Sequence, residues 1–403
     1  MRVLIAAAQF SSNISGLQRH ALALPDCLLR QPDVTEIHFV LAPWQRHLVH
    51  YLAPSHLDRI VTHIAEMDRG LVSRNMWFYR ELPRLVARVQ PDIVHLSYPV
   101  PVDRASIKRP VVLTLHDLYP YDIPENFGFP KVWFNRAILR QCLHNVDATA
   151  CVSDTTLSRL KRYVSRSTWS KALRIYNCVV PSQECAEDSP LPGWNGEPFF
   201  LTVSQHRKNK NIALLLHVFR DLLEYDRIQP STKLVVVGIA GPETSRIHKL
   251  VSELRLHERV VFLEGLSDPA LQWCYRHCEL VAAPSEIEGF GLPVAEALLA
   301  GCRVVCSDIP AFREIDESHC HFAQLGTRFA ENLCDAIVAS LNQPRPSQVS
   351  LPQFLPEILG AQYVDLYRRL LPVTAEVEHP QPFAQVRIST ANEGPLGRRT
   401  GDA

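Results

Sequence analysis

The chain has 403 residues, of which 46% are hydrophobic and 21% are charged. At roughly 100–200 residues per domain, this length predicts two or three domains of an ordinary globular type. No uncharged apolar run approaches about 20 residues, so no transmembrane helix is expected. The eleven cysteines are interpreted as reduced, mostly buried thiols. The pairs Cys274/Cys278 and Cys302/Cys306 are four residues apart and do not have the usual spacing of zinc ligands.

The formal net charge is zero, but the charges are unevenly distributed along the chain. Residues 1–185 carry 22 Lys+Arg and 15 Asp+Glu, which gives +7, whereas the remainder carries 20 and 27, which gives −7. The two halves are therefore predicted to be separate domains with different electrostatic roles. A basic first half could face an anionic membrane or an anionic acceptor, and ordinary surface variation is the alternative.

Short apolar runs alternate with longer amphipathic segments from the start of the chain. The run Met1–Ala8 is too short and too soon interrupted for a signal peptide, and it predicts a buried strand. Continuous apolar strands separated by helices are typical of parallel sheets covered on both faces. The strands expected in the first half are Val3–Ala8, His38–Leu41, Ile93–Tyr98, Val111–Leu115, Ala148–Val152 and Leu173–Tyr176.

Residues 181–198 form the clearest linker, because they are rich in Pro, Gly and acidic residues and show no periodicity. The alternation then restarts, and two successive arrays of this kind predict an α/β protein with a ligand site in the cleft between them. Expected strands are Phe199–Val203, Leu234–Gly238, Val260–Leu263, Leu271–His277, Leu280–Ala283 and Arg303–Ser307. Expected helices are Asn211–Leu223, one near Glu243–Leu254, one from Pro293, and a last one at Phe354–Leu371.

The most informative stretch is Pro284–Ala297, with the sequence PSEIEGFGLPVAEA. An apolar strand ends in a loop that contains Gly289 and Gly291, and Pro293 then opens a helix. Backbone N–H groups at a glycine-rich helix start can approach an anion closely, and the helix dipole favours negative charge there. A phosphate is therefore expected near Phe290–Leu292, although plain turn chemistry is the alternative for this segment alone.

Two glutamates flank this loop. Glu296 lies in the first helical turn, where a carboxylate beside a phosphate is unfavourable unless it accepts hydrogen bonds. The vicinal hydroxyls of a ribose supply two such bonds. Glu288 stands at the entrance of the loop, where a sugar would lie.

The block Glu288–Ser307, EGFGLPVAEALLAGCRVVCS, resembles the E-x7-E region of family 4 glycosyltransferases. These are retaining, nucleotide-sugar-dependent enzymes of the GT-B fold. The resemblance implies an α/β, GT-B architecture in which two Rossmann-like parallel-sheet domains face each other across a cleft. The expected parts are an acceptor-binding domain at 1–182, a nucleotide-sugar-binding domain at 198–350, a helix at 351–372 that packs back on the first domain, and a disordered tail at 373–403.

Other landmarks fall in the family's order. Residues 202–211, TVSQHRKNKN, resemble the basic loop after the first strand of the second domain, and Lys210 with Asn211 matches its KN pair. Arg207 is the candidate for the family's arginine, and Lys208 competes with it. The segment LTLHDLYP resembles the family's HD loop, in which His116 would contact the donor sugar near its hydroxymethyl group.

The loop at residues 11–20 resembles the family's Gly-rich acceptor loop, of which only Gly16 remains. Gly238 ends a VVVG strand, and Leu266 lies in the FLEGLS segment, where the nucleobase usually rests in the family. The candidate catalytic residues are therefore His116, Arg207, Lys210 and Glu288. The candidate donor-binding residues are Gly16, Gly238, Leu266, Phe290, Gly291, Leu292 and Glu296.

The resemblance implies a retaining hexosyltransferase that moves mannose or glucose from a GDP- or UDP-sugar to a glycan or lipid-linked acceptor in polysaccharide biosynthesis. The HD loop favours mannose from GDP-mannose. Arg207 and Lys210 would stabilise the departing diphosphate. No metal or other cofactor is expected, because the sequence has no suitable DxD pair, and no nucleic-acid partner is expected. A nucleotide-sugar epimerase of the same fold and a catalytically inactive sugar-nucleotide-binding subunit are the alternatives.

A cytoplasmic location is expected, with the alternative of peripheral contact on the inner face of the plasma membrane. Arg80, Arg84 and Arg88 recur four residues apart after the aromatic run Met76–Tyr79, and a second cluster follows from Lys131 with Trp133, Phe134, Arg136 and Arg140. Basic and aromatic residues together suit a membrane surface or a lipid-diphosphate acceptor. The alternative is a solvated arginine stripe with its aromatic neighbours in the core.

Overall fold

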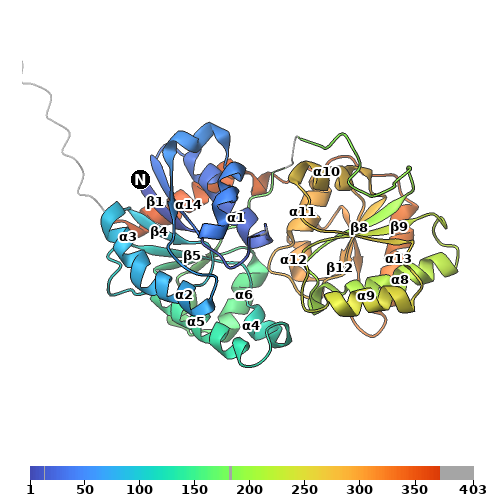
Figure 1. Ribbon diagram of the computed structural model, residues 1–403, viewed down its shortest axis with the longest axis horizontal. Helices are drawn as coiled ribbons and strands as arrows, with labels where there is room; N and C mark the ends of the chain where they lie inside the picture. The colour runs from blue at the N-terminus through green and yellow to red at the C-terminus, as the bar shows by residue number, and fades with distance from the viewer. Residues whose placement is uncertain (13, 181–183, 373–403) are drawn as a thin grey trace, which may run out of the picture. The chain divides into compact units, whose positions relative to one another are not determined.

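The computed structural model describes residues 1–12, 14–180 and 184–372. Residues 1–371 form one compact unit that contains two parallel β-sheets, each with helices on both faces (Figure 1). Two α/β arrays in succession are what the alternation of apolar runs predicts. The predicted disordered tail, 373–403, and part of the predicted linker, 181–183, lie outside the described residues.

The first sheet has the strand order β3-β2-β1-β4-β5-β6-β7, and all neighbouring strands run parallel. Alternate side chains of β1 enter different cores, with Val3 and Ile5 on one face and Leu4 and Ala6 on the other. Burial on both faces explains why these strands are continuous apolar runs. The strands are β1 Arg2–Ala6, β2 Glu36–Leu41, β3 Ile60–Ile64, β4 Ile93–Leu96, β5 Val111–Leu115, β6 Ala148–Cys151 and β7 Ala172–Arg174.

The helices connecting these strands are α1 Gly16–Leu29, α2 Leu71–Met76, α3 Leu82–Val89, α4 Tyr119–Asp122, α5 Lys131–Asn145, α6 Asp154–Tyr163 and α7 Arg166–Trp169. Short 3-10 turns occupy Pro43–Tyr51, Pro54–Arg59 and Pro124–Asn126, and a π-helical turn occupies Trp77–Glu81.

The second sheet has the order β10-β9-β8-β11-β12-β13, again entirely parallel. Its strands are β8 Phe199–Val203, β9 Lys233–Val237, β10 Val260–Leu263, β11 Leu280–Ala283, β12 Val304–Ser307 and β13 Cys320–Ala323. Its helices are α8 Ile212–Glu224, α9 Thr244–Glu253, α10 Asp268–His277, α11 Leu292–Leu299, α12 Pro310–Arg313 and α13 Phe329–Leu341. Short 3-10 turns lie at Lys208–Lys210 and Pro352–Phe354.

Some elements differ from the sequence-based expectations. The predicted strand Leu271–His277 is instead part of helix α10, which begins where the Ser267 hydroxyl accepts a hydrogen bond from the Ala270 N–H at 3.4 Å. Five consecutive residues of this helix, 271–275, are buried, so its sequence shows no helical periodicity. Strands β3 and β13 were not predicted, because polar residues interrupt their short apolar runs: Thr62 and His63 in β3, and His321 in β13.

The last helix, α14 (Pro356–Leu370), lies against α1, on the first sheet's side of the molecule (Figure 1). Its side chains Tyr363 and Tyr367 enter the same core as α1. Gly360 permits the close approach, because a Cβ there would lie 1.9 Å from the carbonyl oxygen of Cys27. The C-terminal helix is thereby part of the first sheet's core.

Candidate active site

A cavity of about 730 Å³ lies where strands of both sheets end. Residues that directly follow β5, β8 and β9 line it, as expected for a ligand site in parallel sheets. The volume is typical of small-molecule sites. All eleven candidate residues line this one cavity: Gly16, His116, Arg207, Lys210, Gly238, Leu266, Glu288, Phe290, Gly291, Leu292 and Glu296.

The N-terminus of helix α11 faces this cavity through Gly291 and Leu292. Gly291 has a φ of +113°, and a Cβ there would lie 2.7 Å from the ring of Phe312, so glycine is required on both counts. The first-turn amide of Leu292 has no acceptor within its own helix and can serve an anion. The Phe290 ring is buried, with its centroid 5.1 Å from that of Phe354. Phe290 therefore offers its main chain, rather than its side chain, to a ligand.

Glu288 and Lys210 form an ion pair in the cavity wall. Only 9% of Glu288 is exposed, and it also accepts a hydrogen bond from the Tyr119 hydroxyl at 3.1 Å. Tyr119 belongs to α4 and therefore joins the first sheet's side of the cavity to the second. Tyr119 was not predicted as a site residue although it lies in the LTLHDLYP segment, because its partner is more than 160 positions away in the sequence.

The basic loop supplies a second cation. Arg207 lines the cavity, and its guanidinium makes no hydrogen bond or ion pair with any residue of the described segments. Lys208 instead approaches Glu125, at 3.6 Å, on the exposed surface and does not line the cavity. The geometry thus favours Arg207 over Lys208 as the second cation that lines the cavity with Lys210.

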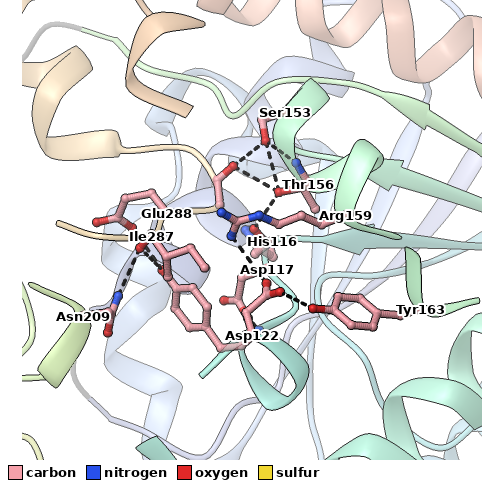
Figure 2. Close-up of polar contacts among 12 residues, drawn as sticks. His116, Asp117, Asp122, Ser153, Thr156, Arg159, Tyr163, Asn209, Ile287 and Glu288 are labelled. Atoms are coloured by element: carbon pink, nitrogen blue, oxygen red, sulfur yellow. Dashed lines mark hydrogen bonds and ion pairs between the residues drawn. The ribbon is translucent and has the colours of Figure 1, made fainter. Parts of the chain in front are cut away.

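Two asparagines tie the basic loop to the glycine-rich loop. The Asn209 side chain donates to the carbonyl of Ile287 at 3.1 Å, a contact that Figure 2 shows. The Asn211 side chain donates to the carbonyl of Pro284 at 3.1 Å, and its backbone is left-handed with a φ of 51°. Asn is among the few residues that adopt this conformation readily. The two loops are therefore held together by short side chains rather than by packing alone.

His116 lies just after β5 and faces the cavity. Its Nε2 is 3.0 Å from the carbonyl oxygen of Ser97, which places the ring proton on Nε2 and leaves Nδ1 as an acceptor. Burial lowers the pKa of His116 to about 4, so the ring is neutral at pH 7. The ring of His20 meets it edge-on, with centroids 4.8 Å apart. A neutral imidazole with a free Nδ1 is suited to accept a hydrogen bond from a sugar hydroxyl.

The backbone around His116 touches the glycine-rich loop directly. A Cβ on Gly289 would lie 1.8 Å from the His116 carbonyl oxygen, so only glycine fits there. The hydroxyls of Ser153 and Thr156 donate to the Gly289 carbonyl, the latter at 3.1 Å (Figure 2). Helix α6 of the first sheet and the loop of the second are thus in contact beside the cavity.

Glu296 accepts a hydrogen bond from the Tyr275 hydroxyl at 2.8 Å. Burial raises the pKa of Glu296, and the nearby Arg19 opposes that rise. Arg19 comes from α1 and pairs with Asp268 at 2.6 Å. Nearby, Gly238 is sterically required, because a Cβ there would lie 1.9 Å from the Ser204 carbonyl oxygen.

The arginine stripe predicted to serve the acceptor lies outside this cavity. Arg80, Arg84 and Arg88 are exposed on the surface, and Arg84 pairs with Glu81. Two of the aromatic residues before them, at 77 and 78, are buried in the core. The buried aromatic residues fit the solvated-stripe alternative, whereas the side chains at 76 and 79 are exposed, and membrane contact through this segment stays a prediction.

Within the described residues, no group of three or more His, Cys, Asp or Glu side chains is arranged to hold a metal ion. None of the helices described is both long enough and apolar enough to cross a membrane. All eleven cysteines are free thiols.

Comparison with known proteins matches each half of the chain to a glycosyltransferase family model. Residues 14–183 match the Glycosyltransferase Family 4 model, and residues 187–342 match the Glycosyl transferases group 1 model. The O-antigen chain mannosyltransferase RfbU of Salmonella typhimurium is 29% identical over 211 residues, which are 51% of this chain and 54% of that protein. The chain thus spans about half the length of the curated relatives it matches.

Solved structures extend the likeness to the whole fold. Anabaena Alr3699/HepE, solved with UDP and glucose, has a TM-score of 0.61 at 16% identity, covering 92% of this chain and 98% of that one. WaaG, a glycosyltransferase involved in lipopolysaccharide biosynthesis, has a TM-score of 0.63 at 14% identity, covering 92% and 94%. Two parallel-sheet α/β arrays and these neighbours confirm the predicted GT-B fold. The chain belongs to the GT-B glycosyltransferases, with a Glycosyltransferase Family 4 first half and a Glycosyl transferases group 1 second half.

Proposed function

We propose that the protein is a retaining glycosyltransferase that moves a hexose from a nucleoside-diphosphate sugar to a glycan or lipid-linked acceptor in polysaccharide biosynthesis. One observation carries this proposal: two cations, a helix N-terminus, the buried Glu288 and the partly buried Glu296 line a single cavity. The cations and the helix N-terminus suit a diphosphate, and the glutamates suit the hydroxyls of a sugar nucleotide. Metal independence and a cytoplasmic location stay predictions.

The chemistry follows from where charge develops. As the bond between the hexose and the diphosphate breaks, negative charge grows on the leaving group. Arg207, Lys210 and the N–H groups at the start of α11 are fixed beside the cavity, so they stabilise that charge without reorganising. His116 accepts a hydrogen bond from the sugar through Nδ1, and Glu296 accepts from the ribose. Glu288 orients the hexose. The acceptor hydroxyl then attacks from the face that the diphosphate leaves and passes its proton to the departing phosphate oxygen, so the anomeric configuration is retained.

The donor is a GDP- or UDP-hexose, with mannose and glucose as the candidates. The relative from Salmonella typhimurium is named as an O-antigen chain mannosyltransferase, and Anabaena HepE was solved with UDP and glucose. The first favours mannose and the second shows that this fold accommodates a uridine nucleotide with glucose. An O-antigen-like polysaccharide is accordingly the proposed product class.

Melting temperatures in UDP, GDP, UDP-glucose and GDP-mannose test the proposal, because a ligand of the folded state alone raises the melting temperature. We expect one nucleotide series to raise it and the other to have little effect. NMR of the product formed from the stabilising donor should then show an anomeric configuration equal to that of the donor. No shift with any nucleotide would contradict the proposal, and an inverted product would contradict the retaining mechanism.

We also propose peripheral membrane contact through the start of α5. Phe129, Trp133 and Phe134 are 83%, 63% and 43% exposed, and Lys131 and Arg140 are exposed on the same segment. Exposed aromatic side chains with cationic neighbours suit an anionic lipid surface. Flotation with anionic vesicles should recover the wild type but not a Phe129→Ser/Trp133→Ser double variant, whereas Tyr225→Ser, which alters an isolated exposed aromatic, should still float. Equal recovery of all three would end the membrane proposal.

A further inference from the structure

The cavity holds an unpaired arginine on the first sheet's side. Arg74 lies in α2, and its guanidinium carbon is 5.7 Å from the ring centroid of Phe10 and 5.9 Å from that of Tyr98. Its Nε is buried and has no hydrogen-bond partner, and no carboxylate of the described residues pairs with it. A buried, unpaired donor on a cation is costly, so the arrangement is expected to satisfy a ligand.

The other cations of the cavity are accounted for. Arg19 pairs with Asp268, and Lys210 pairs with Glu288. The Arg207 guanidinium is also unpaired, but it follows β8 of the second sheet and lines the cavity together with the α11 N-terminus, to which the proposed function assigns the donor diphosphate. Arg74 is carried by the first sheet. Two unpaired cations on opposite sheets indicate two anionic groups, of which the donor supplies only one.

A second unpartnered donor lies in the same wall. Gln9 is only 5% exposed and lines the cavity, and its Nε2 has no hydrogen-bond partner. Its main chain is fixed, since its N–H donates to Gln45 at 2.9 Å and its carbonyl accepts from the Trp44 indole at 3.0 Å. The Gln9 side-chain amide thus starts from a fixed backbone at the cavity wall, and its Nε2 is an unsatisfied donor for an oxygen of the ligand.

Aromatic side chains complete this corner. Phe10 and Tyr51 line the cavity with 54% and 46% of their surface exposed. The Tyr98 hydroxyl donates to the carbonyl of Ala8, which fixes that ring beneath the arginine. Aromatic faces with a few convergent polar groups are typical of small-molecule sites, and they suit the apolar face of a pyranose ring.

We propose that Gln9, Phe10, Tyr51, Arg74 and Tyr98 form an acceptor subsite that recognises a saccharide through an anionic group, either a phosphate or a carboxylate next to the acceptor sugar. This inference rests on the proposed function, because it needs the donor diphosphate to occupy the other side of the cavity. It narrows the acceptor class to acidic saccharides and saccharides on a phosphate-bearing carrier.

Three probes that share an octyl chain and a pyranose of the gluco configuration test this subsite: octyl glucoside, octyl glucuronide and glucosyl octyl phosphate. Each is titrated calorimetrically into the protein, with and without saturating UDP or GDP. We expect at least one anionic probe to bind about tenfold or more tightly than the neutral one, as a charge-assisted hydrogen bond predicts. The preferred anion distinguishes the carboxylate source from the phosphate source.

Arg74→Gln should abolish the preference for the anionic probe, and Arg74→Lys should retain part of it. Arg80→Gln, which removes an exposed arginine outside the cavity, should behave as the wild type. Equal affinity for neutral and anionic probes, no measurable binding of either anionic probe, or an unchanged preference in Arg74→Gln would overturn the subsite. Nucleotide-dependent stabilisation of Arg74→Gln shows that the variant is folded. A wild type that binds no nucleotide but prefers the anionic probe would contradict the proposed function and leave the subsite standing.

Discussion

The Lys210–Glu288 pair is the residue-scale feature on which the proposed chemistry most depends. Lys210→Ala removes a cation from beside the leaving diphosphate and leaves Glu288 without its ion-pair partner. We expect kcat/KM to fall by about 10²–10³-fold while the far-UV circular dichroism spectrum is unchanged. Lys208→Ala, an exposed neighbour outside the cavity, should keep near wild-type activity. Full activity in Lys210→Ala would remove this lysine from the mechanism.

Tyr119 is a positioning residue, because it acts through Glu288. Tyr119→Phe removes one hydrogen bond to that carboxylate and leaves the ring in place. The loss of one hydrogen bond to a charged group predicts a fall in kcat/KM of about tenfold or more. Tyr121→Phe is the matched control. The Tyr121 ring stacks on that of Tyr163, with ring centroids 4.7 Å apart, and does not bond Glu288. If Tyr119 were purely structural, Tyr119→Phe would lower the melting temperature without changing kcat. That result would contradict its assignment as a positioning residue.

At this scale the sequence identifies residues that share a local motif and misses those that meet across the cavity. Glu288 and Lys210 stand in recognisable loops, and the structure brings them into contact. Tyr119 and Arg74 carry no local signal, because their partners come from other strands and helices. Their environment exists only once the two sheets have folded.

At the scale of elements, the start of α11 is set by Gly291. Gly291→Ala forces a side chain into a positive φ and against the Phe312 ring, which would displace the helix start from the cavity. We expect destabilisation of about 1–3 kcal/mol and weaker binding of the donor nucleotide, both measured by thermal denaturation with and without nucleotide.

Gly326→Ala separates the effect of backbone strain at a positive φ from the effect of a steric clash such as that with Phe312. Gly326 has a φ of +129° but open space around its Cβ position, so its variant carries the backbone strain without the clash. It should lose some stability and keep its response to nucleotide. If both variants respond to nucleotide equally, the α11 start does not bind the phosphates.

The elements themselves were predictable where apolar residues follow one another without interruption. Strands Val111–Leu115, Phe199–Val203 and Val260–Leu263 occupy the residues that their apolar runs predict. The edge strands β3 and β13 were missed because Thr62, His63 and His321 interrupt their apolar residues. Pattern reasoning therefore finds strands with an uninterrupted apolar run, including the edge strand β10, and it cannot tell a helix with several consecutive buried residues, such as α10, from a strand.

At the scale of the whole molecule, a buried polar network joins the first sheet to the last helix. His95 bonds Thr114 through Nε2 at 2.8 Å and the Tyr367 hydroxyl through Nδ1 at 2.7 Å. His20, on α1, bonds the same Thr114 at 3.2 Å. Its ring meets that of His116, so the C-terminal helix is linked through this network to the cavity. Long-range contacts of this kind are invisible to local sequence patterns.

This network predicts that stability depends on pH. Burial lowers the pKa of His95 to about 3 and that of His116 to about 4, and it lowers the pKa of His20 well below its usual range. In the unfolded chain these groups titrate near 6.5. Between about pH 6.5 and 4 the unfolded chain therefore binds protons that the folded chain does not, so stability falls as the pH falls. Burial raises the pKa of Asp117 and Glu296, which opposes this trend toward the acidic end of the range.

Melting temperatures measured from pH 8 to pH 5 check the sign. We expect a plateau above about pH 7 and a progressive fall below 6.5, with each buried histidine contributing up to about 1.4 kcal/mol per pH unit. His20→Gln should make that fall shallower, because one titrating group is removed. His257→Gln should not, because His257 is exposed at the surface. A melting temperature that is flat between pH 7 and 5 would mean that the three rings are already solvated, and the neutral state assigned to His116 would then have no basis.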